Sequence, residues 1–387
     1  TIPRVDSIGP MSEYQFYEFR AVDRPLSESE MRELRNISTR AEITARSFRN
    51  EYNWGDLKAD PPRLMEKYFD LHVYVANWGS RLLLVRLPAE ALSLDEATEY
   101  CHHECTYAWE SGEHTLLGLG GDDDGYDDWE EGDGWLDDLA GVRDELMASD
   151  LRALYLGWLL AVQQLEVEDD AEEPAVPPGL GSLSSALDAL RRFLRLDEHL
   201  VAAAAEGSPE PEPGLAGLRV WIDSLPPGDK DEILHQLAVG DQAKARAALL
   251  RLFRDEGRGW TREESRLRRT AEELLARAAE LREAEEREQA RAAEAERRRL
   301  EEIRAAAREK RLTALAERIP EVWQDIEGLV SSTNPKSYDE AVALLVDLRE
   351  LAIRSDDEPR FLADLGALRD RHGRKPSFLR RLEQAGL

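Results

Sequence analysis

The first part of the chain alternates short apolar runs with helical patterns, and it predicts an α+β domain over residues 11–121. Residues 14–21 (YQFYEFRA) are rich in aromatic side chains, as is typical of a strand. Residues 71–76 and 81–87 are two further apolar runs, and the sequence NWGS between them predicts a β-hairpin. Further strands are expected at 40–49 and 114–119.

Start signals mark the helices of this domain. Ser27 and Ser93 are each followed three residues later by a glutamate, a capping-box pattern that satisfies backbone N–H groups of the first helical turn. Asp60 stands before two prolines, which favours an N-cap with proline in the first turn. One sheet packed against two or three helices is therefore expected, and a ferredoxin-like strand order is one arrangement that fits.

Residues 149–258 are predicted to form a helical domain that packs against this head. The segment 150–164 (DLRALYLGWLLAVQQ) is apolar enough for a buried helix. Linkers rich in proline and glutamate follow at 166–181 and 207–214. Further helices are expected near 183–204, 215–224 and 229–254.

A long charged helix is predicted within residues 259–319. Residues 262–318 contain neither proline nor glycine, and 57 residues of helix would extend about 85 Å. The middle, 282–299, holds no leucine, isoleucine or valine, so a sustained coiled-coil seam is missing there. This pattern favours a single helix laced by salt bridges, or one arm of a loose antiparallel pair.

Residues 320–387 predict a small helical tail. Its helices are expected at 320–331, 337–354, 358–371 and 376–384. Four positions resemble one helix of a tetratricopeptide-type hairpin: Tyr338, Ala341, Leu345 and Leu348. One such unit is too few to form a repeat array.

Charge changes the functional picture. The chain has 51 Lys and Arg against 80 Asp and Glu, and residues 1–258 hold 25 of the basic and 52 of the acidic residues. The field of such a front half repels nucleic acid and anionic membranes and attracts basic partners. Direct nucleic-acid binding and membrane association are therefore not expected.

Composition also suggests a compartment. Two cysteines, Cys101 and Cys105, are too few for a disulfide framework, and no apolar run reaches the roughly 18 residues of a membrane span. We therefore expect a cytoplasmic protein. Residues 1–10 precede Met11, where the folded pattern begins, and are interpreted as an expression remnant.

The segment 122–148 is expected to be an acidic loop that carries tryptophans. Residues 122–138 contain 10 carboxylates together with Trp129 and Trp135. The predicted binding residues are Asp122, Asp123, Asp124, Asp127, Asp128, Trp129, Glu130, Glu131 and Trp135. Carboxylates around aromatic anchors can occupy the basic groove of a partner protein. The alternative is a solvated insertion that only raises solubility.

One cluster could hold a metal. Cys101 and Cys105 flank His102, and His114 follows, so thiolate and imidazole ligands for zinc are at hand. The three-residue gap between the cysteines is unusual for a zinc pair. Partly buried cysteines beside surface histidines are the favoured interpretation, so neither a metal nor a cofactor is predicted.

A second chemical alternative lies in Asp56-Leu57-Lys58. This triplet could be the acid-x-lysine half of a nuclease site, with Glu42 or Glu51 as the upstream acid, although such triplets are common by chance. No Walker A, serine-elbow or HExxH sequence is present. An enzyme is therefore not favoured.

Several stretches resemble a family of uncharacterised bacterial proteins. They are YQFYEFRAVDRPL (14–26), NEYNWGDLKADPPRLMEKYFD (50–70), ANWG (76–79), SDLRALYLGWLLAVQ (149–163) and PAVPPGLG (174–181). The similarity covers residues 11–255 and implies no catalytic residues. Separately, HGRKPSFLRRLEQAGL (372–387) is similar to the ends of some bacterial SWIM zinc-finger proteins, without their zinc motif, and implies only a helical docking tail.

The expected function is that of a non-enzymatic acidic adaptor or inhibitor. Its head would bind a basic protein and its tail a second protein, within a bacterial defence or nucleic-acid-processing assembly. The alternative is a nuclease-like or metal-dependent subunit that uses Asp56 and Lys58 or the Cys101–Cys105 cluster.

Overall fold

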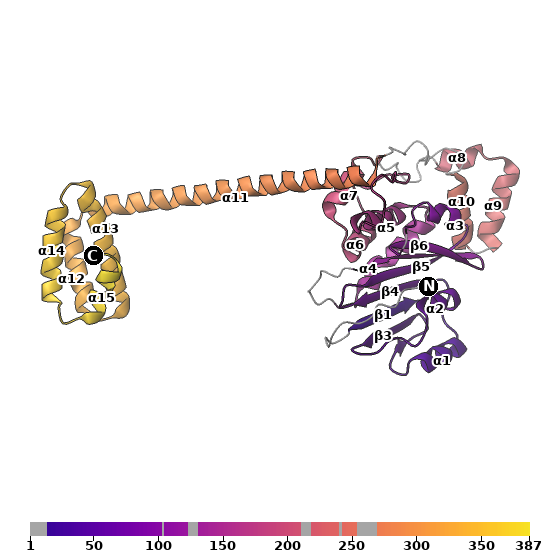
Figure 1. Ribbon diagram of the computed structural model, residues 1–387, viewed down its shortest axis with the longest axis horizontal. Coiled ribbons are helices and arrows are strands. Elements are labelled where there is room, and N and C mark those ends of the chain that lie inside the picture. The colour runs from indigo at the N-terminus through magenta and orange to yellow at the C-terminus, as the bar shows by residue number, and fades with distance from the viewer. Residues whose placement is uncertain (1–13, 103, 123–130, 210–217, 240–241, 254–268) are drawn as a thin grey trace. The chain divides into compact units, whose positions relative to one another are not determined.

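The computed structural model describes residues 14–102, 104–122, 131–209, 218–239, 242–253 and 269–387 (Figure 1). The chain divides into two compact units, Thr1–Ala284 and Glu285–Leu387. A seven-stranded antiparallel sheet with helices comes first, and a long helix and a helical C-terminal region follow. The predicted fold class, α+β followed by mostly α, is confirmed.

The sheet has the strand order β2-β3-β1-β4-β5-β7-β6. Its strands are β1 (Gln15–Arg20), β2 (Glu42–Ile43), β3 (Ser47–Tyr52), β4 (Leu71–Ala76), β5 (Arg81–Pro88), β6 (Thr106–Ser111) and β7 (His114–Gly121). The predicted hairpin is β4 and β5, and the run at 40–49 divides between β2 and β3. A ferredoxin-like order is wrong, because β1 and β3, the strands before and after α1, pair directly and antiparallel. In a ferredoxin-like β-α-β unit these strands would be parallel, with another strand between them.

Alternation along the strands gives the sheet two apolar faces. On β1, Phe16 belongs to one buried cluster, while Tyr17 and Phe19 belong to the other. Helices α1 (Glu28–Ile37) and α2 (Pro61–Lys67) contribute buried side chains to the second cluster. The predicted capping box of α1 is present. The Ser27 side chain accepts from the Glu30 N–H, and the Glu30 carboxylate accepts from the Ser27 N–H at 2.7 Å.

The other helix starts are also as expected, with one difference in detail. Ser93 caps α3 (Leu94–Thr98) by accepting from the Glu96 N–H. Asp60 is the N-cap of α2, but its side chain makes no capping hydrogen bond. The two prolines that follow it remove backbone donors from the first turn, so fewer N–H groups there require a cap.

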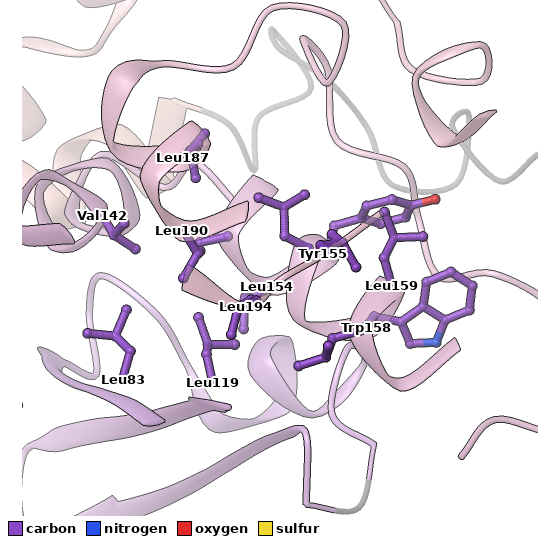
Figure 2. Packing of buried hydrophobic residues seen from close by; sticks show 14 of the residues in the cluster. Leu83, Leu119, Val142, Leu154, Tyr155, Trp158, Leu159, Leu187, Leu190 and Leu194 are labelled. Carbon is purple, nitrogen blue, oxygen red and sulfur yellow. The ribbon is translucent and has the colours of Figure 1, made fainter. Parts of the chain in front are cut away.

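Helices cover the first face of the sheet. They are α4 (Trp135–Met147), α5 (Arg152–Gln163), α6 (Ser185–Phe193) and α7 (Glu198–Ala205). Figure 2 shows Leu83 and Leu119 of the sheet beneath Val142, Leu154 and Leu190 of three of these helices. Head and helical block therefore share one core and form a single unit.

Helix α5 is apolar all round, and residues 153–162 are all buried. Gly157 lets this helix approach the sheet closely. A Cβ at that position would lie 2.3 Å from Oγ1 of Thr106 and 2.6 Å from Cδ2 of Leu119. A side chain of any size is therefore excluded at this contact.

The segment 122–148 is not a loop throughout. Residues 135–147 form α4, in which Leu136, Leu139, Val142 and Leu146 are buried against the sheet and α6. These four leucine and valine positions follow helical spacing, but the acidic residues between them hide the pattern in the sequence.

The first unit is completed by three short helices. They are α8 (Leu218–Ser224), α9 (Pro227–Val239) and α10 (Gln242–Phe253). Trp221, Leu225 and Phe253 form a small buried cluster among them.

Helix α11 (Ala271–Ala316) contains 46 residues, a length of about 69 Å. Ala271, Leu274 and Ala278 belong to the core of the first unit. Residues 282–311 are exposed throughout, as predicted for a charged single helix. The expected first turns, 262–268, lie outside the described residues. The prediction is wrong for residues 269 and 270, because Arg269 binds Glu173 and Thr270 forms a β-bridge with Glu172, so the helix begins at Ala271.

The second unit has its own core. It contains α12 (Ile319–Ser331), α13 (Pro335–Arg354), α14 (Glu358–Arg371) and α15 (Pro376–Gln384), close to the predicted bounds. The four tetratricopeptide-like positions, Tyr338, Ala341, Leu345 and Leu348, are all buried in this core.

Candidate functional site

The predicted binding segment is described only at its two ends. Asp123, Asp124, Asp127, Asp128, Trp129 and Glu130 lie outside the described residues. Asp122 and Glu131 are exposed, and Trp135 is half-buried.

Its first end is held against α5. The backbone carbonyl of Asp122 accepts a hydrogen bond of 3.0 Å from Nε2 of Gln164. A Cβ at Gly121 would lie 2.6 Å from the same nitrogen, so glycine permits this approach. The acidic segment therefore leaves the sheet from a fixed point.

Its second end is held against the sheet. The N–H of Gly132 donates to the Tyr14 hydroxyl at 3.3 Å, and a Cβ at Gly132 would lie 2.3 Å from the Phe16 ring. Asp133 pairs with Arg49 of β3 at 2.6 Å, and the Arg49 guanidinium also lies 5.0 Å from the centre of the Phe16 ring.

Asp137 forms a similar pair with Arg20 of β1 at 2.7 Å. Two carboxylates of the segment are therefore already neutralised by arginines of the head. Both are exposed ion pairs, which contribute about 0–1 kcal/mol each to stability.

Trp135 packs within the first unit. Its ring lies edge-on to Phe193 of α6, with 5.2 Å between centroids. The guanidinium groups of Arg81 and Arg192 lie 5.8 and 5.9 Å from the ring centre. This is a packing position between α4 and α6, and it differs from the exposed position expected of a binding anchor.

The two cysteines have local hydrogen-bond partners. Sγ of Cys101 donates to the carbonyl of Ala97 at 3.2 Å, and Sγ of Cys105 donates to Oε1 of Gln164 at 2.8 Å. Burial raises the pKa of Cys101 to about 11 and raises the pKa of Cys105 further, with Glu166 adding to the effect. Both thiols are therefore poorly disposed to form the thiolates that a metal binds.

Strand register separates the histidine from the cysteines. Cys105 precedes Thr106, which pairs with Leu119, whereas His114 pairs with Ser111 at the other end of the β6–β7 hairpin. Five residue steps along a strand amount to about 16 Å. Among the described residues, no three ligand atoms from Cys101, His102, Cys105 and His114 come within coordinating distance of one another.

The acid-x-lysine triplet does not meet its predicted acids. Oδ1 of Asp56 accepts hydrogen bonds from the Tyr17 hydroxyl and the Leu57 N–H, both at 2.7 Å. Glu51 forms an ion pair with Arg49, whose guanidinium lies over the Phe16 ring. Glu42 is the cross-strand neighbour of Arg49, so both glutamates lie on the Phe16 face of the sheet. Because Tyr17 and Phe16 point to opposite faces of the sheet, Asp56 and the two glutamates lie on different sides.

Two buried carboxylates were not predicted. Asp70 accepts from Arg86 at 2.6 Å and from the N–H groups of Val22 and Asp23 at 2.6 and 3.0 Å. Burial alone would raise the pKa of Asp70, but the Arg86 guanidinium and these hydrogen bonds hold it below its ordinary value. Glu173, a second buried carboxylate of the first unit, binds Arg269. The partners are 16 and 96 residues apart, so local sequence patterns give no signal for either pair.

The comparisons add no relative. No protein-family model matches the chain, and no curated protein or solved structure matches it significantly.

Within the described parts of the chain, no helix is both long enough and apolar enough to cross a membrane.

Proposed function

We propose that this protein is a non-enzymatic adaptor. Its acidic first unit binds a basic protein, its second unit binds another protein, and α11 sets a spacing between the two binding regions. The observation that carries the proposal is the pair of separate cores joined by a helix that is exposed throughout residues 282–311. A helix that buries so little surface adds little to a hydrophobic core, so its role in this proposal is to space the two binding regions.

Charge supports a basic partner for the first unit. The excess of carboxylates lies in residues 1–258, and the acidic segment is anchored at both ends against the sheet and α5. Anchored ends reduce the conformational entropy lost on binding. The arginine pairs of Asp133 and Asp137 show that guanidinium groups suit this surface.

The setting extends the proposal further. We place the adaptor in the bacterial cytoplasm, within a defence or nucleic-acid-processing assembly, on composition and family resemblance alone. A nuclease-like or metal-dependent subunit has less support, because Asp56 lies on the opposite face from Glu42 and Glu51 and the thiols are poor ligands.

The test is affinity purification from the native host, with the full chain as bait and mass spectrometry of what it retains. A second bait carries Asn or Gln at the six acidic positions from Asp122 to Glu130. A control bait carries six such neutral substitutions on exposed carboxylates of the second unit. A basic protein retained by wild type and control, and lost from the second bait, supports the proposal. Equal retention by all three baits would overturn the role of the acidic segment.

A further inference from the structure

Helix α11 carries two large apolar residues on an otherwise charged surface. The side chains of Leu300 and Ile303 are 44% and 55% exposed. At helical spacing they continue a stripe that includes Ala293 and Ala307, which are also exposed. Positions 293, 300 and 307 repeat every seven residues, with Ile303 three residues after the second, as on one face of a short coiled coil.

The second unit covers the C-terminal part of α11. Leu312 is buried, and Arg311 pairs with the buried Asp347 of α13 at 2.7 Å. Nine residues separate Ile303 from Leu312, and at about 100° per residue they point in opposite directions. Ile303 therefore lies on the side of α11 opposite the buried Leu312, and Leu300 lies about 120° around the helix from Leu312.

Charge along α11 is polarised. Residues 285–292 comprise three glutamates and two arginines, whereas residues 304–311 comprise four basic residues and one glutamate. Arg308 and Arg311 already bind carboxylates of α13, so Arg304 and Lys310 supply most of the remaining positive charge. Two such helices side by side would repel one another if parallel and attract one another if antiparallel.

From these observations we infer that α11 binds a second copy of this chain, with the two helices antiparallel over residues 286–310. Ile303 of one copy packs against Ala293 of the other, so a large side chain faces a small one. Lys310 then lies opposite Glu286 of the second copy, and Ala307 lies opposite Gln289.

The centre of this pairing is also balanced in charge. Glu296 falls opposite Leu300 of the second copy, within one turn of the second copy's Arg297 and Arg299. In a parallel pair, Glu296 would instead face its own counterpart. Because large apolar residues occupy only two positions of the stripe, the association is reversible and weak. This self-association is independent of the partners of the adaptor.

Cysteine crosslinking of the full-length protein tests the geometry. Chains carrying Ala293→Cys and chains carrying Ile303→Cys are prepared separately, mixed, and oxidised with diamide. We expect a disulfide-linked dimer from the mixture and neither variant to crosslink efficiently by itself, because like positions lie about 15 Å apart along antiparallel helices. Wild type, with only Cys101 and Cys105, gives the background. Efficient crosslinking of Ile303→Cys alone would indicate parallel pairing and overturn the inference, as would a mixture that does not exceed background.

Sedimentation velocity across a concentration series tests the stripe. Leu300→Glu combined with Ile303→Glu should raise the dimer dissociation constant at least tenfold. The matched control is Ala295→Glu combined with Ala305→Glu, which adds the same two charges at exposed positions outside the stripe. Circular dichroism checks that each variant keeps its helix. A wild-type chain that stays monomeric at every concentration, or equal weakening by the control, would contradict the proposed surface.

Discussion

The Arg269 guanidinium forms two hydrogen bonds, of 2.7 and 2.9 Å, to the carboxylate of Glu173, whose side chain is fully buried. The Tyr155 hydroxyl donates to the same carboxylate at 2.8 Å. Arg269 also donates to the carbonyls of Ala203 and Ala204 at the end of α7. One ion pair therefore joins α5, α7 and the residues just before α11, and it fixes the point from which the long helix leaves the first unit.

Removing the Glu173 carboxylate should lower the unfolding free energy of the first unit. Glu173→Ala leaves a partly buried guanidinium without its counter-charge, and breaking a buried pair in this way costs about 3–5 kcal/mol. Chemical denaturation followed by tryptophan fluorescence measures the loss. The control is the exposed neighbour Glu172→Ala, which should change stability by less than about 0.5 kcal/mol. Similar losses for both variants would show that Arg269 is satisfied elsewhere.

His72 should make the first unit sensitive to acid. It is fully buried beside Phe19, with ring centroids 3.9 Å apart, and its Nδ1–H donates to the Glu18 carbonyl at 2.9 Å. Burial lowers the pKa of His72 to about 3. The unfolded chain binds a proton near pH 6.5, whereas the folded chain resists protonation down to about pH 3. Stability therefore falls as pH drops through this window, by up to about 1.4 kcal/mol per pH unit.

A His72→Phe variant should lose this contribution, so its unfolding free energy should fall less steeply between pH 6.5 and 4. The exposed His235→Phe serves as control. Denaturation curves over a pH series provide the measurement, and parallel slopes for His72→Phe and wild type would exclude His72 as a source of the acid sensitivity.

Gly157 should not tolerate a methyl group. In Gly157→Ala the added carbon would collide with Thr106 and Leu119, and overpacking of this kind costs about 1–3 kcal/mol. Gly366 of α14 is a matched helical glycine with open space around its Cβ position. Gly366→Ala should instead stabilise the second unit by up to about 1 kcal/mol. Thermal unfolding measures the change in stability of both variants, which should be a loss for Gly157→Ala and a gain for Gly366→Ala. A gain for both substitutions would mean that α5 can shift away from the sheet.

Freeing the acidic segment should strengthen its binding to cations. Arg20→Gln together with Arg49→Gln removes the partners of Asp137 and Asp133, so more negative charge faces an incoming protein. Affinity for a lysine-rich peptide, measured by fluorescence anisotropy over a salt series, should increase several-fold at low salt and converge at high salt. Arg24→Gln together with Arg63→Gln, which breaks exposed pairs with Glu30 and Asp60, controls for net charge. An equal gain for this control would assign the effect to overall charge.

Local patterns predicted most of the fold. Features that depend on neighbouring residues are present as predicted. They are the capping residues Ser27 and Ser93, the hairpin turn before Arg81 and the helices of the second unit. The sequence did not predict strand β6, which is an edge strand. Its side chains from Tyr107 to Trp109 are all half-buried, so the alternation of apolar and polar residues that indicates a strand is weak there. Helix α4 was missed because its acidic residues dominate the composition.

The candidate site was less predictable. The charge of the acidic segment is plain in the sequence, but its anchoring depends on Arg49 and Tyr14, each more than 80 residues away. The same limit applies to Asp56. It accepts a hydrogen bond from the distant Tyr17 hydroxyl, and this contact determines on which face of the sheet Asp56 lies. Pairings between distant residues are set by tertiary packing, which a single sequence does not reveal.

The buried helix α5 has a consequence for synthesis on the ribosome. Its ten consecutive buried residues, 153–162, share a cluster with Leu190 of α6 and with Leu274 of α11. The last of these leaves the ribosome more than 100 residues after α5. Until then, this apolar helix lacks part of its cover and can bind other nascent chains. Slow translation between residues 163 and 274 would lengthen this interval, so the yield of folded protein should depend on codon choice there and on chaperones that shield apolar segments.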